Sequence, residues 1–162
     1  MKHILRSDSA VQIPLLELRV KILQETGKIL NDEFNGTFLN CIKKANGSAK
    51  SLLKLITDYF PSYRDETIVL GRKLTFYKRA QILIADIWGC FEGRDAGYFH
   101  DIDIITMFAD YRVPQVLKFY DVIDYADDLK AFLKRNTMLT SGARFENEIR
   151  AGSIVACRVK EI

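Results

Sequence analysis

The fold is decided by residues 76–117, which read FYKRAQILIADIWGCFEGRDAGYFHDIDIITMFADYRVPQVL. The first part has the apolar pattern of a helix but contains Lys78, Arg79 and Asp86. The last part places the polar triplet Asp-Tyr-Arg shortly before Pro114. Charged groups beside an apolar wall must be paired, solvated in a cleft or used in chemistry. The stretch therefore predicts helices that carry a functional site.

Helical periodicity also dominates the rest of the chain, because apolar residues recur every three or four positions. The predicted helices run from Pro14 to Asn35, Phe38 to Asn46, Ser48 to Pro61, 76 to 91, Asp101 or Asp103 to Asp110, Pro114 onward, Tyr125 to Asn136, and Phe145 to Val159. The Asn35-Gly36 and Asn46-Gly47 pairs are expected to end the first two helices, and Ser48 is the expected N-cap of the third. Thr75 is the expected cap of the helix 76–91, and residues 67–70 are expected to form a short strand or an extended loop. Together these elements predict a mainly α, single-domain helical assembly over residues 1–162.

Composition limits the classes of function. The chain has 162 residues, is 48% hydrophobic and carries a net charge of +3, which is too small to indicate nucleic-acid binding by itself. Residues 1–80 nevertheless hold 14 Lys and Arg against 8 Asp and Glu, so the first half is basic. A basic half is compatible with an anionic ligand and equally with a solvated lysine-rich surface.

Cysteine and histidine usage bears on metal sites and on the cellular compartment. The three cysteines, Cys41, Cys90 and Cys157, are far apart, and the two histidines are His3 and His100. This pattern argues against a zinc site and favours a reducing compartment. No apolar run approaches the length of a membrane span, and Met1–Ala10 does not resemble a signal peptide. We therefore expect a cytoplasmic protein without a membrane partner.

Asp110 has two interpretations. Its carboxylate can accept backbone N–H groups at the start of the helix that contains Pro114, where the helix dipole favours negative charge. Alternatively, it faces a sugar and stabilises an oxocarbenium-like transition state or orients a water molecule, as glycosidic cleavage requires. Both interpretations stay open at this point.

The polar residues nearby also have structural and functional interpretations. Arg112 either pairs with Asp110 or binds a phosphate, and Tyr111 is either a half-buried aromatic or part of a site. Arg79 and Asp86 are seven residues apart on one helical stripe, which suits two separate ion pairs or the wall of a ligand cleft. Further along, Glu146, Glu148 and Arg150 alternate on a predicted helix, so they cannot all face the same way.

Six blocks of this sequence resemble the queuosine salvage proteins. The three strongest are KRAQILIADIW (78–88), DIDIITMFADYRVPQVL (101–117) and ENEIRAGSI (146–154). The three weaker ones are HILRSD (3–8), IPLLELRVKIL (13–23) and NGSAKSLLKLITDYFPSYRDE (46–66). The segment FADYRVPQVL is long and specific, so helical bias alone does not explain the match.

The resemblance implies a helical fold related to the helix-hairpin-helix DNA glycosylases. It also implies hydrolysis of the N-glycosidic bond of queuosine 5′-monophosphate, which releases queuine for tRNA modification without a metal or an organic cofactor. By the same resemblance, Asp110 is the catalytic carboxylate and Lys78 is its partner in the active site. Tyr111 and Arg112 are then expected to line the ribose phosphate.

The substrate suggests further contacts. Queuine is a 7-deazaguanine, so its carbon at position 7 cannot take the proton that would help the base to leave. Its guanine-like edge presents N–H donors, for which Asp86 or Asp103 is the expected acceptor. Lys78 or Arg79 is expected to bind the phosphate, and Trp88 is expected as an apolar wall of the cleft.

Two departures from the family pattern stand out. The similarity begins almost at the first residue, so the chain resembles the C-terminal portion of a family member. Asn147 occupies a position that is usually apolar in this block, and burying its amide without hydrogen bonds would cost about 1–3 kcal/mol.

Two classes of function follow from the sequence. The first is a nucleotide N-glycosidase that acts on a small-molecule substrate and forms no stable complex with nucleic acid. The alternative is a non-enzymatic helical module that binds nucleic acid or nucleotide through the basic first half, with the steep salt dependence of phosphate contacts.

Overall fold

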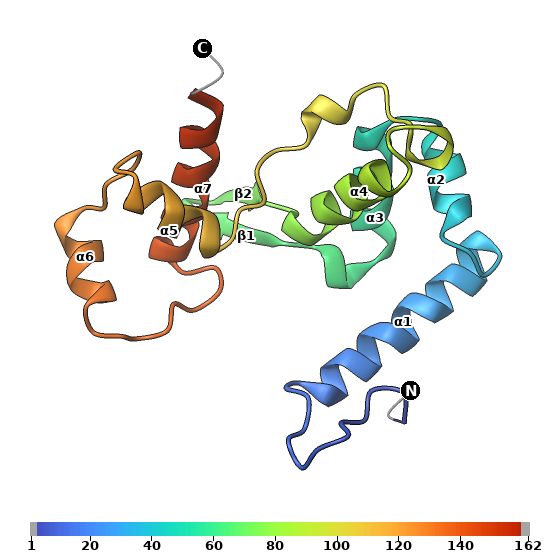
Figure 1. Cartoon of the computed structure of the whole chain (residues 1–162), viewed down its shortest axis with the longest axis horizontal. Coiled ribbons are helices and arrows are strands. Elements are labelled where there is room, and N and C mark those ends of the chain that lie inside the picture. Colours follow the sequence, from blue (N-terminus) through green and yellow to red (C-terminus); the bar gives the residue numbers. More distant parts are fainter. Residues whose placement is uncertain (1–2, 160–162) are drawn as a thin grey trace. The chain divides into compact units, whose positions relative to one another are not determined.

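The computed structural model describes residues 3–159 of the chain, which are mainly α-helical (Figure 1). The helices are α1 Leu16–Phe34, α2 Leu39–Ala45, α3 Ala49–Tyr59, α4 Lys78–Cys90, α5 Arg112–Phe119, α6 Asp127–Leu133 and α7 Arg144–Val159. One hairpin is formed by β1 Glu66–Val69 and β2 Arg72–Thr75, and short 3-10 turns lie at Pro61–Tyr63, Asp95–Gly97 and Ile102–Ile104. Within this described part, no helix combines the length and apolar character needed to cross a membrane.

The chain forms two compact units, each built from two segments. The first unit comprises residues up to Tyr63 together with Asp86–Ile102, and the second comprises Arg64–Ala85 together with residues from Asp103 onward. The mainly α class predicted from periodicity is confirmed, whereas the single-domain organisation stays a prediction.

The first unit is held together by the packing of α2 against α3. The left-handed conformation of Asn35 and Asn46 ends α1 and α2, as the Asn-Gly pairs predict. Phe34 and Phe60 are buried and stack with their ring centroids 6.0 Å apart. Cys41 is fully buried here, and this burial raises the pKa of its thiol to about 11. An apolar core therefore stabilises the α2–α3 pair.

The N-terminus of α3 is capped twice. Ser48 Oγ accepts a hydrogen bond from the Ser51 amide at 3.1 Å, as predicted. The carboxylate of Asp101, 52 residues further along, accepts from the Ala49 amide at 2.5 Å and from Ser48 Oγ at 2.8 Å. Partial burial tends to raise the pKa of Asp101, but these hydrogen bonds outweigh it and keep the pKa below its usual value.

Replacing Asp101 with alanine should destabilise the first unit. The loss of a side chain that caps a helix N-terminus typically costs about 1 kcal/mol. Urea unfolding followed by circular dichroism would measure this loss, with Asp86→Ala as the matched control because Asp86 is an exposed carboxylate of the same unit. Equal stability of the two variants would show that the Asp101 cap contributes nothing.

The helix predicted from Asp101 or Asp103 to Asp110 is wrong. Only a 3-10 turn forms at Ile102–Ile104, and the following residues have no regular structure. Asp101 cannot cap a helix of its own, because its carboxylate is bound to α3. In the second unit the buried Gln81 side chain accepts from the Thr106 amide at 2.8 Å, and this side-chain contact replaces a helical backbone bond.

The second unit begins with the hairpin. Glu66 pairs with Thr75 and Val69 with Arg72, which leaves a two-residue turn at Leu70-Gly71 with φ values of 51° and 73°. Positive φ at both turn residues is the geometry that suits a tight hairpin. The expected cap at Thr75 is wrong, because Thr75 pairs in β2 and α4 begins only at Lys78.

The start of α4 is instead bound by Asp65. Its Oδ2 accepts a hydrogen bond from the Lys78 amide at 3.2 Å. The remaining helices agree with their predicted positions, although α6 is shorter than the predicted range, and α5 begins two residues before Pro114. Since α5 packs against α7 (Figure 1), the segment that ends at Asp110 is brought beside α7.

Candidate functional site

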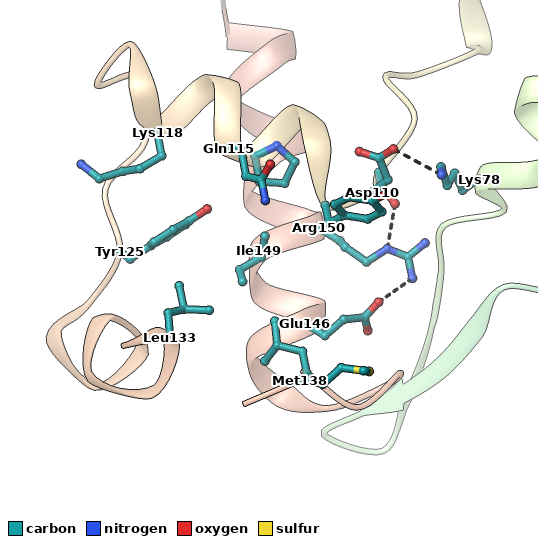
Figure 2. Close-up of a pocket in the computed structure, with 14 residues that line it drawn as sticks. Lys78, Asp110, Gln115, Lys118, Tyr125, Leu133, Met138, Glu146, Ile149 and Arg150 are labelled. Atoms are coloured by element: carbon teal, nitrogen blue, oxygen red, sulfur yellow. Dashed lines mark hydrogen bonds and ion pairs between the residues drawn. The ribbon is translucent and has the colours of Figure 1, made fainter. Parts of the chain in front are cut away.

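The second unit contains a pocket of about 720 Å³ between α5, α7 and the segment that follows α6. Its lining residues are Lys78, Ala109, Asp110, Tyr111, Pro114, Gln115, Lys118, Tyr125, Leu133, Met138, Leu139, Glu146, Ile149 and Arg150. Figure 2 shows Lys78, Asp110 and Arg150 at one side of this pocket, and Lys118, Tyr125 and Leu133 at the other. The volume is of the size that small-molecule ligands occupy, and a few polar groups converge on mainly apolar walls.

Asp110 uses its two carboxylate oxygens differently. Oδ1 accepts hydrogen bonds from the amides of Arg112 at 2.8 Å and Val113 at 3.1 Å, in the first turn of α5. Oδ2 lies 3.3 Å from Lys78 Nζ, and the carboxylate lines the pocket. The capping interpretation and the pocket-facing interpretation therefore both agree with the geometry, each for one oxygen.

The environment of Asp110 favours its ionised form. Burial tends to raise the pKa of Asp110, but the hydrogen bonds from the Val113 and Arg112 amides and the contact with Lys78 keep the pKa below its usual value. The Asp110 side chain is only 20% exposed and that of Lys78 only 29%. Asp110 therefore presents a negative charge to the pocket at neutral pH.

Arg150 was not among the residues predicted for the site, although it lines the pocket. Its Nε donates to the Ala109 carbonyl oxygen at 2.9 Å, directly before Asp110 in the chain. Its Nη1 donates to Asp65 Oδ1 at 2.9 Å and to Glu146 Oε1 at 3.0 Å. Because Ala109 and Asp65 come from distant segments, sequence spacing could have indicated only the Glu146–Arg150 pair on one helical face.

The charged side chains of α7 lie on two different faces of the helix. Glu146 and Arg150 are four residues apart and line the pocket, whereas Glu148 is exposed and pairs with Arg144, with 2.6 Å between Oε1 and Nε. Asn147 is 4% exposed, and its Nδ2 donates to the Gly142 carbonyl oxygen at 2.9 Å. Asn147 Oδ1 is buried without a hydrogen-bond partner, so the unusual amide at this position is only half satisfied.

The other predicted site residues are only partly brought to the pocket. Tyr111 lines the pocket, although the residue is 66% exposed. Arg112, Arg79 and Asp103 belong to the same unit, are exposed and are absent from the pocket wall. The remaining two, Asp86 and Trp88, are exposed residues of the first unit. Their roles in substrate binding stay predictions.

The described residues 3–159 also bear on metal binding. No group of three or more His, Cys, Asp or Glu side chains in that range is placed to hold a metal ion.

Acidification should destabilise the second unit. Burial tends to raise the pKa of Asp65, but hydrogen bonds from Arg150 and the Lys78 amide lower it below its usual value, as for Asp110. A carboxylate with a lowered folded-state pKa stabilises the fold above its unfolded pKa of about 3.9, and this contribution is lost as the pH falls through the folded-state value. Urea unfolding at pH 7, pH 5 and pH 3.5 should show most of the loss at the lowest pH. Stability that rises on acidification would contradict these shifts, and Asp65→Asn should weaken the pH dependence.

Comparison with known proteins agrees with these motifs. The sequence model of the queuosine salvage protein family matches residues 1–161. A mouse protein named queuosine 5′-phosphate N-glycosylase/hydrolase is 51% identical over 154 residues, which are 95% of this chain and 46% of the mouse protein. The Bos taurus protein of the same name is 52% identical over 95% of this chain and 45% of its own length. The Schizosaccharomyces pombe protein of that name is 43% identical over 92% of this chain and 44% of its own length.

These matches have a defined extent. The chain spans less than half of the length of the curated relatives that it matches. The family match nevertheless covers nearly every residue of the chain, including the segments that build the pocket. This chain therefore belongs to the queuosine salvage protein family.

Proposed function

We propose that this chain hydrolyses the N-glycosidic bond of queuosine 5′-monophosphate and releases queuine. The observation that carries the proposal is the ionised Asp110 carboxylate in a ligand-sized pocket, with Lys78 Nζ 3.3 Å from its Oδ2. The names of the relatives support the substrate and the bond that is cleaved. The carboxylate, the pocket and the family membership together support a glycosidase rather than a binding module.

Cleavage of an N-glycosidic bond is assisted by a carboxylate such as that of Asp110. Cleavage of a nucleoside bond passes through a sugar with oxocarbenium character, so positive charge develops on the pentose. A fixed carboxylate stabilises that charge most strongly where water is largely excluded. Because the two amides hold Oδ1 in place, Oδ2 is the oxygen available to face the sugar or an attacking water molecule.

Lys78 complements this role. Its ammonium lies 3.3 Å from Oδ2 and adds to the hydrogen bonds from the Val113 and Arg112 amides in keeping the carboxylate ionised, since an opposite charge at short distance favours the charged form. The leaving base cannot be protonated at position 7, so the main assistance must come from the sugar side. Asp110 is therefore the group that must stabilise the positive charge on the sugar.

The direct test is incubation of the chain with queuosine 5′-monophosphate and mass-spectrometric detection of free queuine. Guanosine 5′-monophosphate, which has nitrogen at position 7 and lacks the substituent of queuine, is the matched control for selectivity. We expect queuine release and much slower release of guanine. An absence of queuine, together with salt-sensitive binding of tRNA in a mobility-shift titration, would favour the nucleic-acid-binding alternative.

A further inference from the structure

The side chain of Arg150 is fixed on several sides. It is 12% exposed and contacts both oxygens of Asp65, in addition to Glu146 and the Ala109 carbonyl. Its guanidinium carbon lies 4.0 Å from the ring centroid of Phe76, which is itself buried. A planar guanidinium can make these contacts at once because its donors form a rigid fork.

The same network reaches the backbone beside both members of the candidate catalytic pair. On one side, Arg150 Nε bonds to the carbonyl of Ala109, the residue before Asp110. On the other side, Asp65 Oδ2 contacts Arg150 and also accepts from the amide of Lys78 at 3.2 Å. The Arg150–Asp65 pair therefore connects the main chain at Lys78 with the main chain at Asp110.

We propose that Arg150 and Asp65 act as a positioning clamp that sets the distance between the Lys78 ammonium and the Asp110 carboxylate. The proposal deepens the proposed function and rests on it for its catalytic meaning. Neither clamp residue is assigned contact with the reacting atoms; both act through Lys78 and Asp110. Catalysis is sensitive to displacements of about 1 Å. A clamp on the two backbone segments should therefore affect the catalytic rate more strongly than it affects the affinity for the substrate.

Two conservative substitutions separate the clamp from simple charge pairing. Arg150→Lys keeps a positive charge near Asp65 and Glu146, but one ammonium cannot reproduce the fork that joins Asp65 to Ala109. Asp65→Asn keeps an acceptor for the Lys78 amide and removes the charge that binds Arg150. Arg144→Lys is the matched control, because Arg144 lies on the same helix with a side chain that is 73% exposed.

Steady-state kinetics gives the first readout. Both clamp variants should lower kcat for queuosine 5′-monophosphate by roughly 10- to 100-fold, the scale of a small misplacement of catalytic groups. KM should stay within about threefold, since Asp65 does not line the pocket and lysine keeps a positive side chain at the position of Arg150 in the pocket wall. The Arg144→Lys variant should retain both constants. Unchanged kcat in a folded Arg150→Lys or Asp65→Asn variant would overturn the proposal.

A second readout does not depend on activity. The amides of Arg112 and Val113 bond to Asp110 Oδ1, so their ¹⁵N–¹H shifts follow the titration of Asp110. If the clamp holds Lys78 close, both variants should raise the titration midpoint of Asp110 toward that of the Lys78→Met variant. The other charged side chains on this pocket wall are Lys118, Glu146 and Arg150, and the variants keep a positive charge at position 150.

The two proposals fail in different ways. A wild-type chain that releases no queuine contradicts the proposed function, but the titration still decides whether Arg150 and Asp65 set the Lys78–Asp110 contact. Midpoints equal to wild type in folded variants contradict the clamp. Global loss of dispersed amide signals in both variants also contradicts it, because the pair would then serve the stability of the whole unit.

Discussion

Asp110→Asn is expected to slow the release of queuine from queuosine 5′-monophosphate by about 1,000-fold or more while the chain stays folded. The asparagine oxygen can still accept from the Arg112 and Val113 amides, so the start of α5 keeps its cap. What disappears is the negative charge that faces the pocket beside Lys78. Removing one group that stabilises developing charge typically lowers kcat by about 100- to 1,000-fold. The Asp110 carboxylate is the main such group proposed here, so the upper end of this range is expected.

The measurement is single-turnover release of the free base, followed by mass spectrometry. Asp127→Asn is the matched control, because Asp127 is an exposed carboxylate of the same unit that does not line the pocket. An Asp110→Asn variant that turns over at the wild-type rate would remove Asp110 from the catalytic role.

The second large effect is on stability. Arg150→Met should reduce the free energy of unfolding by about 3 kcal/mol, the lower end of the range for removing one partner of a buried ion pair. Methionine fills part of the volume but leaves Asp65, with a side chain 24% exposed, and Glu146, at 20%, without their cation. It also leaves the Ala109 carbonyl without its donor.

Urea unfolding of Arg150→Met should be compared with that of Arg144→Met. The latter removes an exposed cation from the same helix and should change stability by about 0.5 kcal/mol or less. If the two variants are equally stable, the Arg150 network does not stabilise the second unit.

Local signals predicted much of the fold. The apolar periods of α1 to α3, the Asn-Gly pairs after α1 and α2, and the Ser48 cap act within a few residues, so the sequence reveals them. The elements that were predicted wrongly depend on contacts with residues far away in the sequence. Asp101 resembles a local helix start but caps α3, and Gln81 binds the Thr106 amide across 25 positions.

The candidate site divides along the same line. Asp110 and Lys78 were predicted because they lie in specific sequence blocks, and the structure places them 3.3 Å apart. The Asp65–Arg150 pair joins residues 85 positions apart, which no period or motif indicates. Asp86 and Trp88 were expected at the site because they lie on the same helix as Lys78. The first part of α4 belongs to the second unit, however, and the part from Asp86 onward belongs to the first.

The most direct test of the account is calorimetric titration with a protonated pyrrolidine analogue of ribose 5′-phosphate, which carries a fixed positive charge where the oxocarbenium ion would develop. A site complementary to that charge binds such a cation more tightly than the neutral tetrahydrofuran counterpart. We predict that the wild-type chain prefers the cation by at least about tenfold and that Asp110→Asn loses this preference. Equal affinity for the cation and its neutral counterpart in the wild-type chain would contradict the central role of the Asp110 carboxylate.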